Sequence, residues 1–135
     1  MSTQDNVQVV QQLFAAYEQG DMPAVLSTIV ADVTWQEPGP ADLVPWAGTR
    51  RGREQVADWF RVLGEAEEIL EFEPRAFIAQ GDKVVVLGFE RVRVRATGCT
   101  YENDWAFVFT VRDGKIAGLR TYHDTAAIVA AYRRT

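Results

Sequence analysis

From Ile69 onward, apolar residues alternate with polar ones in four segments, and this period of two predicts β-strands at residues 69–79, 83–96, 101–111 and 115–123. The segments are separated by the short turn sequences Gln80-Gly81-Asp82, Thr97-Gly98 and Arg112-Asp113-Gly114. Turns this short join antiparallel strands, because parallel strands need a long crossover connection. The second half of the chain is therefore predicted to be an antiparallel meander.

The first third of the chain is helical in pattern. Apolar residues recur at helical spacing up to Gly20, a stop signal, and a second short helix begins after Asp21, an N-cap candidate followed by Pro23. A brief strand is expected at residues 33–37 and an ordered loop, with three prolines and two glycines, at residues 38–48. Gly52 opens a third helix, and residues 124–132 are expected to form a short closing helix.

Composition limits the protein to one core. A chain of 135 residues with 47% hydrophobic content is expected to fold as a single domain over residues 1–135. Its 19 acidic against 14 basic residues argue against nucleic acid or an anionic membrane as a partner. The single cysteine cannot form an internal disulfide, and no signal-peptide pattern or membrane-spanning apolar run is present, so we expect a cytoplasmic location.

The segment Trp35-Gln36-Glu37-Pro38 carries most of the chemical information. The alternation of a strand places Trp35 and Glu37 on the same face, which we expect to be buried. A carboxyl group among apolar residues is a candidate proton carrier, because loss of water makes it a usable base near neutrality. The alternative is that Glu37 ends the strand in contact with water.

Charge pairing predicts the register of the central hairpin. If Thr97-Gly98 is a two-residue turn, Arg91 faces Asp104 and Arg93 faces Glu102, two opposite-charge pairs. On the other face, which we expect to line a cavity, Val86, Gly88, Glu90 and Val92 then lie opposite Phe109, Phe107, Trp105 and Asn103. Gly88 would leave room there for a ligand. Glu90 would be a second carboxyl in apolar surroundings, unless it contacts water or pairs with an arginine.

Three further residues are candidates for the site. His123, the only histidine, ends the last predicted strand, and imidazole transfers protons near neutral pH, although a lone histidine is more often structural. Trp46 could cover the mouth of a pocket or pin its loop to the core. Tyr17 could offer a hydroxyl group or simply pack in the core. Four tryptophans make an aromatic-lined cavity plausible, although they could also fill it themselves.

The sequence lacks the residues that other kinds of catalytic or binding site would need. One histidine and one distant cysteine do not make a metal site, and neither Ser27 nor Cys99 has a recognisable base beside it. The glycines at residues 48–53 do not follow a strand in the dinucleotide-binding manner, and the arginines there are interpreted as a solvated loop face. We therefore expect no metal and no organic cofactor.

Several segments together resemble the nuclear-transport-factor-2-like superfamily, and within it the SnoaL-like, ketosteroid-isomerase-related branch. They are Glu-Gln-Gly-Asp at 18–21, Ala-Asp-Val-Thr-Trp-Gln-Glu-Pro at 31–38, Arg-Asp-Gly-Lys-Ile at 112–116 and Tyr-His-Asp-Thr-Ala-Ala-Ile-Val-Ala-Ala at 122–131. The resemblance implies an α+β fold of cystatin-like type, in which a curved, mostly antiparallel sheet wraps around N-terminal helices to make a cone. It also implies an apolar pocket and a homodimer.

The resemblance assigns roles residue by residue. Glu37, directly before Pro38, matches the general base of the ketosteroid isomerases. The oxyanion-hole tyrosine of that family falls on Leu13, and its protonated aspartic acid falls near Phe107, so neither donor is present. The residue pattern of the limonene-epoxide-hydrolase branch has no counterpart in the chain.

Two functions follow. In the first, the protein is a cofactor-free enzyme of isomerase or cyclase type that acts on a small hydrophobic carbonyl compound, with Glu37 as base and His123, Tyr17 or Glu90 assisting. The expected walls of the pocket are Trp35, Trp46, Phe60, Gly88, Asn103, Trp105, Phe107 and Leu119. In the second, the same cone binds a hydrophobic ligand, or mediates dimerisation, without turnover.

Overall fold

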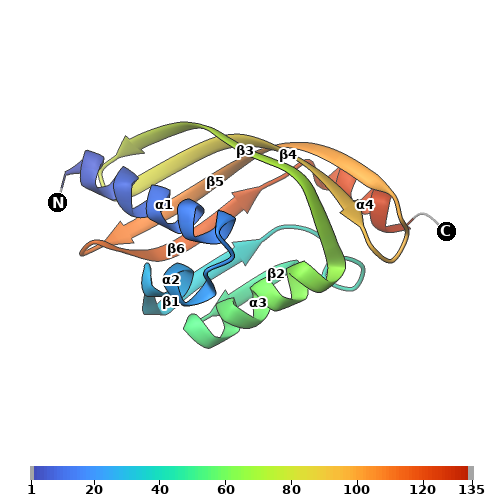
Figure 1. The fold of residues 1–135 in the computed structure, drawn as a ribbon, viewed down its shortest axis with the longest axis horizontal. Helices are drawn as coiled ribbons and strands as arrows, with labels where there is room; N and C mark the ends of the chain where they lie inside the picture. The colour runs from blue at the N-terminus through green and yellow to red at the C-terminus, as the bar shows by residue number, and fades with distance from the viewer. Residues whose placement is uncertain (1, 134–135) are drawn as a thin grey trace.

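The computed structural model describes residues 2–133. Its helices are α1 (Thr3–Glu18), α2 (Met22–Ser27), α3 (Arg53–Ala66) and α4 (Thr125–Arg133). Its strands are β1 (Ile29–Glu37), β2 (Gly48–Arg51), β3 (Glu67–Gln80), β4 (Lys83–Val94), β5 (Thr100–Arg112) and β6 (Lys115–Tyr122). Figure 1 shows these elements in chain order.

The six strands form one curved, open sheet in the order β2-β1-β6-β5-β4-β3. All neighbours are antiparallel except β1 and β6, which run parallel, so the sheet is mixed. Helix α1 lies along the inner face of β3 to β6, and α3 packs near β1, β2 and β3 (Figure 1). The predicted α+β architecture, a curved and mostly antiparallel sheet wrapped around helices, is confirmed.

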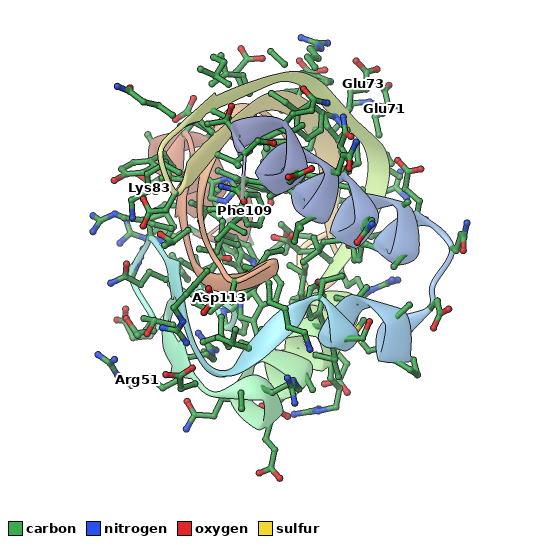
Figure 2. The ribbon with its side chains drawn as sticks, turned by 90° about the vertical axis from the view of Figure 1, so that its left-hand side faces the viewer. Arg51, Glu71, Glu73, Lys83, Phe109 and Asp113 are labelled. Atoms are coloured by element: carbon green, nitrogen blue, oxygen red, sulfur yellow. The ribbon has the colours of Figure 1, made fainter. Side chains whose placement is uncertain are left out.

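Side chains on the inner side of the sheet form the core. Figure 2 shows Phe109 inside the curve and Glu71, Glu73 and Lys83 at the outside. Phe109 is 1% exposed, and the neighbouring inner positions of β4 and β5 are buried as well. The alternation of strand side chains therefore gives the sheet one apolar face that the helices cover.

The helices begin where local signals place them. Ser2 and Asp5 form a capping box at α1, and the Asp21 side chain accepts from the backbone N–H of Ala24 at α2. Gly52 precedes α3 with a φ of +85°, a conformation that glycine adopts without strain. Among residues 2–133, no helix combines the length and apolar character needed to cross a membrane.

The prediction for the arginine-rich segment was wrong. Residues 48–51 form β2, which pairs with the end of β1, and the loop before it ends at Ala47. The Arg50 guanidinium donates to the carbonyls of Pro45, Trp46 and Ala47, while that of Arg53 donates to the Ile29 carbonyl. These arginines hold the backbone of the loop and of the start of β1 through side-chain hydrogen bonds. Strand β1 also begins four residues earlier than expected, at Ile29.

The predicted register of the central hairpin was wrong by two residues. Arg91 lies opposite Glu102, Arg93 opposite Thr100, Gly88 opposite Trp105 and Glu90 opposite Asn103. The connection is longer than two residues, because β4 ends at Val94 and β5 begins at Thr100. The two arginines pair with β3 instead, Arg91 with Glu71 at 3.0 Å and Arg93 with Glu68 at 2.8 Å. A slip of two residues leaves every side chain on its predicted face.

Candidate functional site

A cavity of about 70 Å³ lies inside the curve of the sheet, against α1 and α3. Its walls are mostly aromatic and aliphatic, and its polar groups come from the strands. The lining residues are Leu13, Phe14, Tyr17, Trp35, Glu37, Trp46, Trp59, Phe60, Leu63, Glu67, Ile69, Phe72, Glu90, Tyr101, Phe107, Phe109, Leu119, Thr121 and His123. Three buried carboxyl groups therefore face one apolar space.

Glu37 is the last residue of β1, and its side chain is 2% exposed. The Thr121 hydroxyl, on the parallel neighbour β6, donates to its Oε1 over 2.5 Å. Its Oε2 is fully buried and has no hydrogen-bond partner within residues 2–133. Because buried carboxylate oxygens are normally paired, this free oxygen is the atom best placed to accept a proton from a ligand in the cavity.

A hydrogen-bonded chain fixes the tautomer of His123. The backbone N–H of Asp124 donates to Asn103 Oδ1 over 2.7 Å, so the amide nitrogen of Asn103 points the other way, to Glu90 Oε2 at 2.9 Å and to His123 Nδ1 at 2.5 Å. An amide nitrogen only donates, so His123 Nδ1 accepts. The neutral ring then carries its proton on Nε2, 3.6 Å from Glu37 Oε1.

Glu90 lies on the other side of the histidine, with its Oε2 3.7 Å from His123 Nδ1. Burial raises the pKa of Glu90 to about 7, while the neighbouring His123 and the hydrogen bond from Asn103 act in the opposite direction. Glu90 therefore exchanges its proton near neutral pH. Glu37, His123 and Glu90 form a continuous row of proton-carrying groups along one side of the cavity.

Glu67, which the sequence analysis did not identify, forms a second polar cluster at the start of β3. Its Oε2 accepts from the indole N–H of Trp46 over 2.8 Å, from the Tyr101 hydroxyl over 3.0 Å and from the Tyr132 hydroxyl over 2.8 Å. Burial raises the pKa of Glu67, and the three donors oppose that rise. Burial also raises the pKa values of both tyrosines, followed by the effect of the Glu67 charge, so their hydroxyls remain protonated donors.

Several predicted wall residues do line the cavity. Trp35, Phe60, Phe107 and Leu119 contribute apolar surface, and Tyr17 contributes a hydroxyl group. Burial, followed by the charge of Glu90, raises the pKa of Tyr17 to about 12, which keeps that hydroxyl a donor at neutral pH.

Trp46 is a buried wall, 2% exposed, and not a residue at the mouth of the pocket. Its indole N–H bonds to Glu67, and its backbone carbonyl accepts from the Trp59 indole over 2.8 Å. Trp46 therefore pins its loop to the core.

Three predicted ligand contacts lie outside the cavity lining. The space over Gly88 is filled by the ring of Trp105, whose carbon atoms would collide with a Cβ at that position. Trp105 in turn stacks on Phe107, with ring centroids 4.0 Å apart. Asn103 does not line the cavity either, and it positions Glu90 and His123 instead. The two-residue shift in register explains the first error, because it brings Trp105 opposite Gly88.

The polar residues that sequence reasoning missed carried weak signals. Thr121 lies two residues before His123 and so on the same strand face, and Tyr101 shares its face with Asn103 and Trp105. Glu67 lies at the junction between a helix and a strand, where no periodic pattern marks it. Within residues 2–133, no group of three or more His, Cys, Asp or Glu side chains is arranged to hold a metal ion.

A curved sheet that encloses an apolar cavity with helices on its inner face defines an α+β protein of the NTF2-like, cystatin-like class. Residues 10–119 match the model of the SnoaL-like domain. The chain belongs to this family. A search of curated proteins found no match.

Solved structures agree with this assignment. An NTF2-like protein from Burkholderia xenovorans LB400 is 42% identical, with 98% of this chain and 99% of that chain covered and a TM-score of 0.91. An NTF2-like protein from Burkholderia thailandensis E264 is 30% identical, with 97% and 98% covered and a TM-score of 0.83. TerC, co-crystallised with polyporic acid, is 27% identical, with 95% and 98% covered and a TM-score of 0.84.

Proposed function

We propose that this protein is a cofactor-free enzyme that moves a proton within a small, largely apolar carbonyl compound, in a reaction of isomerase or cyclase type. The observation that carries the proposal is the free, buried Oε2 of Glu37 in an aromatic-walled cavity. An apolar cavity selects an apolar ligand, and an unpaired carboxylate oxygen inside it is available as a base.

In this proposal each polar residue has a part in the reaction. Glu37 Oε2 takes a proton from the carbon next to the substrate carbonyl, and the electron pair of that bond moves onto the carbonyl oxygen. Thr121 holds Glu37 in place through Oε1. Glu37 then returns the proton to a different carbon, which restores the carbonyl group and completes an isomerisation.

His123 and Glu90 support this proton transfer. His123 Nε2 lies 3.6 Å from Glu37 Oε1, and the proton on this nitrogen stabilises a charged Glu37. Asn103 holds Glu90 and His123 side by side, and Glu90, with a pKa of about 7, can exchange a proton with His123 Nδ1, which lies 3.7 Å from its Oε2. Tyr17 offers a hydroxyl to the carbonyl oxygen from the α1 side of the cavity.

Deuterium exchange tests this proposal without knowledge of the natural substrate. Cyclohexanone and 1-tetralone in D₂O should exchange the protons next to their carbonyl groups faster with the protein than with buffer alone, as followed by ¹H NMR. Glu37→Gln should lower the protein-dependent rate by about 10²- to 10⁴-fold. Glu18→Gln, at an exposed position of α1, is the matched control and should leave the rate unchanged. Exchange that persists in Glu37→Gln would refute the role of this residue.

Ligand binding without turnover is the second candidate function. It is favoured by Leu13 and Phe107, apolar residues that stand in the cavity wall where the ketosteroid isomerases have oxyanion donors. TerC was crystallised with polyporic acid, which makes this compound a suitable probe for calorimetry. Binding of polyporic acid or 1-tetralone with no exchange by the wild-type protein would favour this function over catalysis.

We also propose that the protein is a homodimer built on the outer face of the sheet. Ile78, Leu87 and Tyr122 are exposed there by 53%, 41% and 47%. Strand pairing places Ile78 beside Val85, which lies beside Val108, and it places Leu87 beside Ala106, which lies beside Tyr122. These residues form one apolar strip across β3, β4, β5 and β6, which we call the outer strip. An exposed strip of this kind is typical of an interface between copies of a chain.

A further inference from the structure

We propose that the ligand of this cavity carries a protonated amine, and that the ionised carboxylate of Glu67 binds this ammonium group through Oε1. Glu67 is then a specificity-determining residue, and the substrate class narrows to small carbonyl compounds that also bear an amine. The carbonyl part of this inference rests on the proposed function, whereas the ammonium site can be measured without it.

The hydrogen bonds on Glu67 favour its charged form. Its Oε2 accepts from Trp46, Tyr101 and Tyr132 at 2.8 to 3.0 Å, and all three donors are neutral groups. Donors of this kind bind an ionised carboxylate more strongly than a neutral carboxylic acid. Burial acts against the charge, and a cation in the cavity would offset that cost. The cluster is therefore suited to hold an anion.

The anion lacks a counter-ion in the described part of the chain. Glu67 is 5% exposed, and buried carboxylates are normally paired with a cation. Within residues 2–133 no lysine or arginine lines the cavity. His123 lies between the other two carboxyl groups, 3.6 Å from Glu37 Oε1 and 3.7 Å from Glu90 Oε2, so its ring cannot balance all three. A ligand can supply the positive charge that the protein does not place there.

The second oxygen of Glu67 is free to meet such a ligand. Oε1 takes part in no hydrogen bond within residues 2–133, and it is not among the fully buried atoms without a partner, so it is open to the cavity that Glu67 lines. The three donors on Oε2 fix the orientation of the carboxylate. An ammonium N–H would give Oε1 both a hydrogen bond and a compensating charge, whereas a hydroxyl group would give only the hydrogen bond.

The walls around Glu67 suit an organic cation. Trp46, Trp59 and Tyr101 line the same cavity, and the faces of aromatic rings attract cations. The ring centroid of Trp46 lies 5.6 Å from that of His123, while its indole N–H bonds to Glu67. Trp46 thus adjoins both polar groups of the cavity. One small molecule can therefore place an ammonium group at Glu67 and a carbonyl group beside Glu37 and His123.

Two ligands with the same ring test the ammonium site in the wild-type protein. Cyclohexylamine is a cation at pH 7 and cyclohexanol is neutral, and isothermal titration calorimetry measures both affinities. Cyclohexylamine should bind at least about tenfold more tightly. Equal affinities, tighter binding of cyclohexanol, or no saturable binding of cyclohexylamine at millimolar concentrations would each overturn the proposal.

A variant then locates the preference at Glu67. Glu67→Gln keeps the length of the side chain and an oxygen for the three donors but removes the charge, so the preference for cyclohexylamine should disappear while cyclohexanol still binds. Glu18→Gln removes an exposed charge and should keep the preference, which controls for the net charge of the protein. In the wild type, cyclohexylamine should also shift the indole N–H resonance of Trp46. A folded Glu67→Gln that retains the preference would overturn the proposal, and thermal unfolding shows whether the variant is folded.

Deuterium exchange separates this inference from the proposed function. Relative to their rates in buffer, 4-(dimethylamino)cyclohexanone should exchange about tenfold faster with the protein than its neutral isostere 4-isopropylcyclohexanone, and Glu67→Gln should abolish the difference. If cyclohexylamine is preferred but no ketone exchanges, the ammonium site stands and the catalytic function fails. If exchange of cyclohexanone depends on Glu37 but no amine is preferred, the catalytic function stands and this inference fails.

Discussion

Glu90 illustrates how burial controls the charge of a single residue in this cavity. Its pKa is raised from 4.5 to about 7, so between these two values the folded protein binds more protons than the unfolded chain. The stabilisation linked to this proton is fully present below about pH 4.5 and is lost as the pH rises through about 7.

The corresponding prediction concerns Glu90→Gln, which cannot ionise. Relative to the wild type, the variant should gain stability between pH 5 and pH 8, by on the order of 2–3 kcal/mol. Urea unfolding at a series of pH values measures the difference. Glu18→Gln should show no such trend, and a flat difference for Glu90→Gln as well would show that Glu90 is not buried in its neutral form.

Gly88 is a second residue-scale case, because the ring of Trp105 occupies the place of a side chain. A Cβ there would collide with that ring and would lie 2.7 Å from the Glu73 carbonyl oxygen, which belongs to the backbone and cannot move freely. Gly88→Ala should therefore lower the free energy of unfolding by about 3 kcal/mol.

The matched control for Gly88→Ala lies in α3. Gly64→Ala meets nothing within 4 Å and should raise the stability by about 0.5–1 kcal/mol, because alanine favours a helix over glycine. Chemical denaturation compares the two variants. Equal effects of the two substitutions would contradict the packing of Trp105 over Gly88.

At the scale of elements, the loop between β1 and β2 is held by Arg50, whose guanidinium donates to three consecutive carbonyls. Arg50→Ala should lower the free energy of unfolding by about 1–2 kcal/mol and speed amide hydrogen exchange at residues 43, 44, 46 and 47, because the carbonyls of Pro45 and Ala47 lose this donor and that of Trp46 keeps only the Trp59 indole. Arg51→Ala is the control from the same strand, since its exposed side chain forms no hydrogen bond to a backbone carbonyl among residues 2–133. Unchanged exchange in Arg50→Ala would show that Trp46 alone fixes the loop.

The connection between β4 and β5 is another element-scale feature with a tertiary role. The Thr97 hydroxyl donates to the Ala131 carbonyl over 2.8 Å and so joins this hairpin to α4. Helix α4 in turn carries Tyr132 to Glu67. Side-chain hydrogen bonds thus join the β4–β5 connection to α4, and α4 to the cavity.

At the scale of the whole molecule, the outer strip predicts assembly. Leu87→Glu should weaken the dimer roughly tenfold or more, because it places a charge in the centre of an apolar interface. Sedimentation velocity over a range of concentrations checks this outcome, and Gln11→Lys, on the exposed side of α1, should leave association unchanged. A wild-type protein that sediments as a monomer at every concentration would contradict the dimer.

Much of the fold follows from local patterns in the chain. The periodic stripe before Gly20, the N-cap at Asp21 and the turns Gly81-Asp82 and Asp113-Gly114 are short-range signals, and the structure places the helices and hairpins accordingly. The central hairpin was misplaced because its arginines could pair with more than one strand, and only the assembled sheet shows that they pair with β3.

The candidate site was only partly predictable for the same physical reason. Glu37 and Glu90 lie on strand faces that alternation predicted to be inner, whereas His123 was a candidate because it is the only histidine and ends the last predicted strand. Glu67 accepts hydrogen bonds from residues that lie 21, 34 and 65 positions away in the chain, and no local sequence pattern connects residues so far apart.

The sequence by itself determined most of the secondary structure, the inner and outer faces of the strands and membership of the SnoaL-like family, because periodicity and turn chemistry act over a few residues. Tertiary structure alone decided which carboxyl oxygens accept hydrogen bonds, which ring nitrogen of His123 carries the proton and that Trp105 fills the space over Gly88. Those properties depend on atoms from distant strands that lie within 4 Å of each other, because burial and hydrogen bonding act only over such short distances.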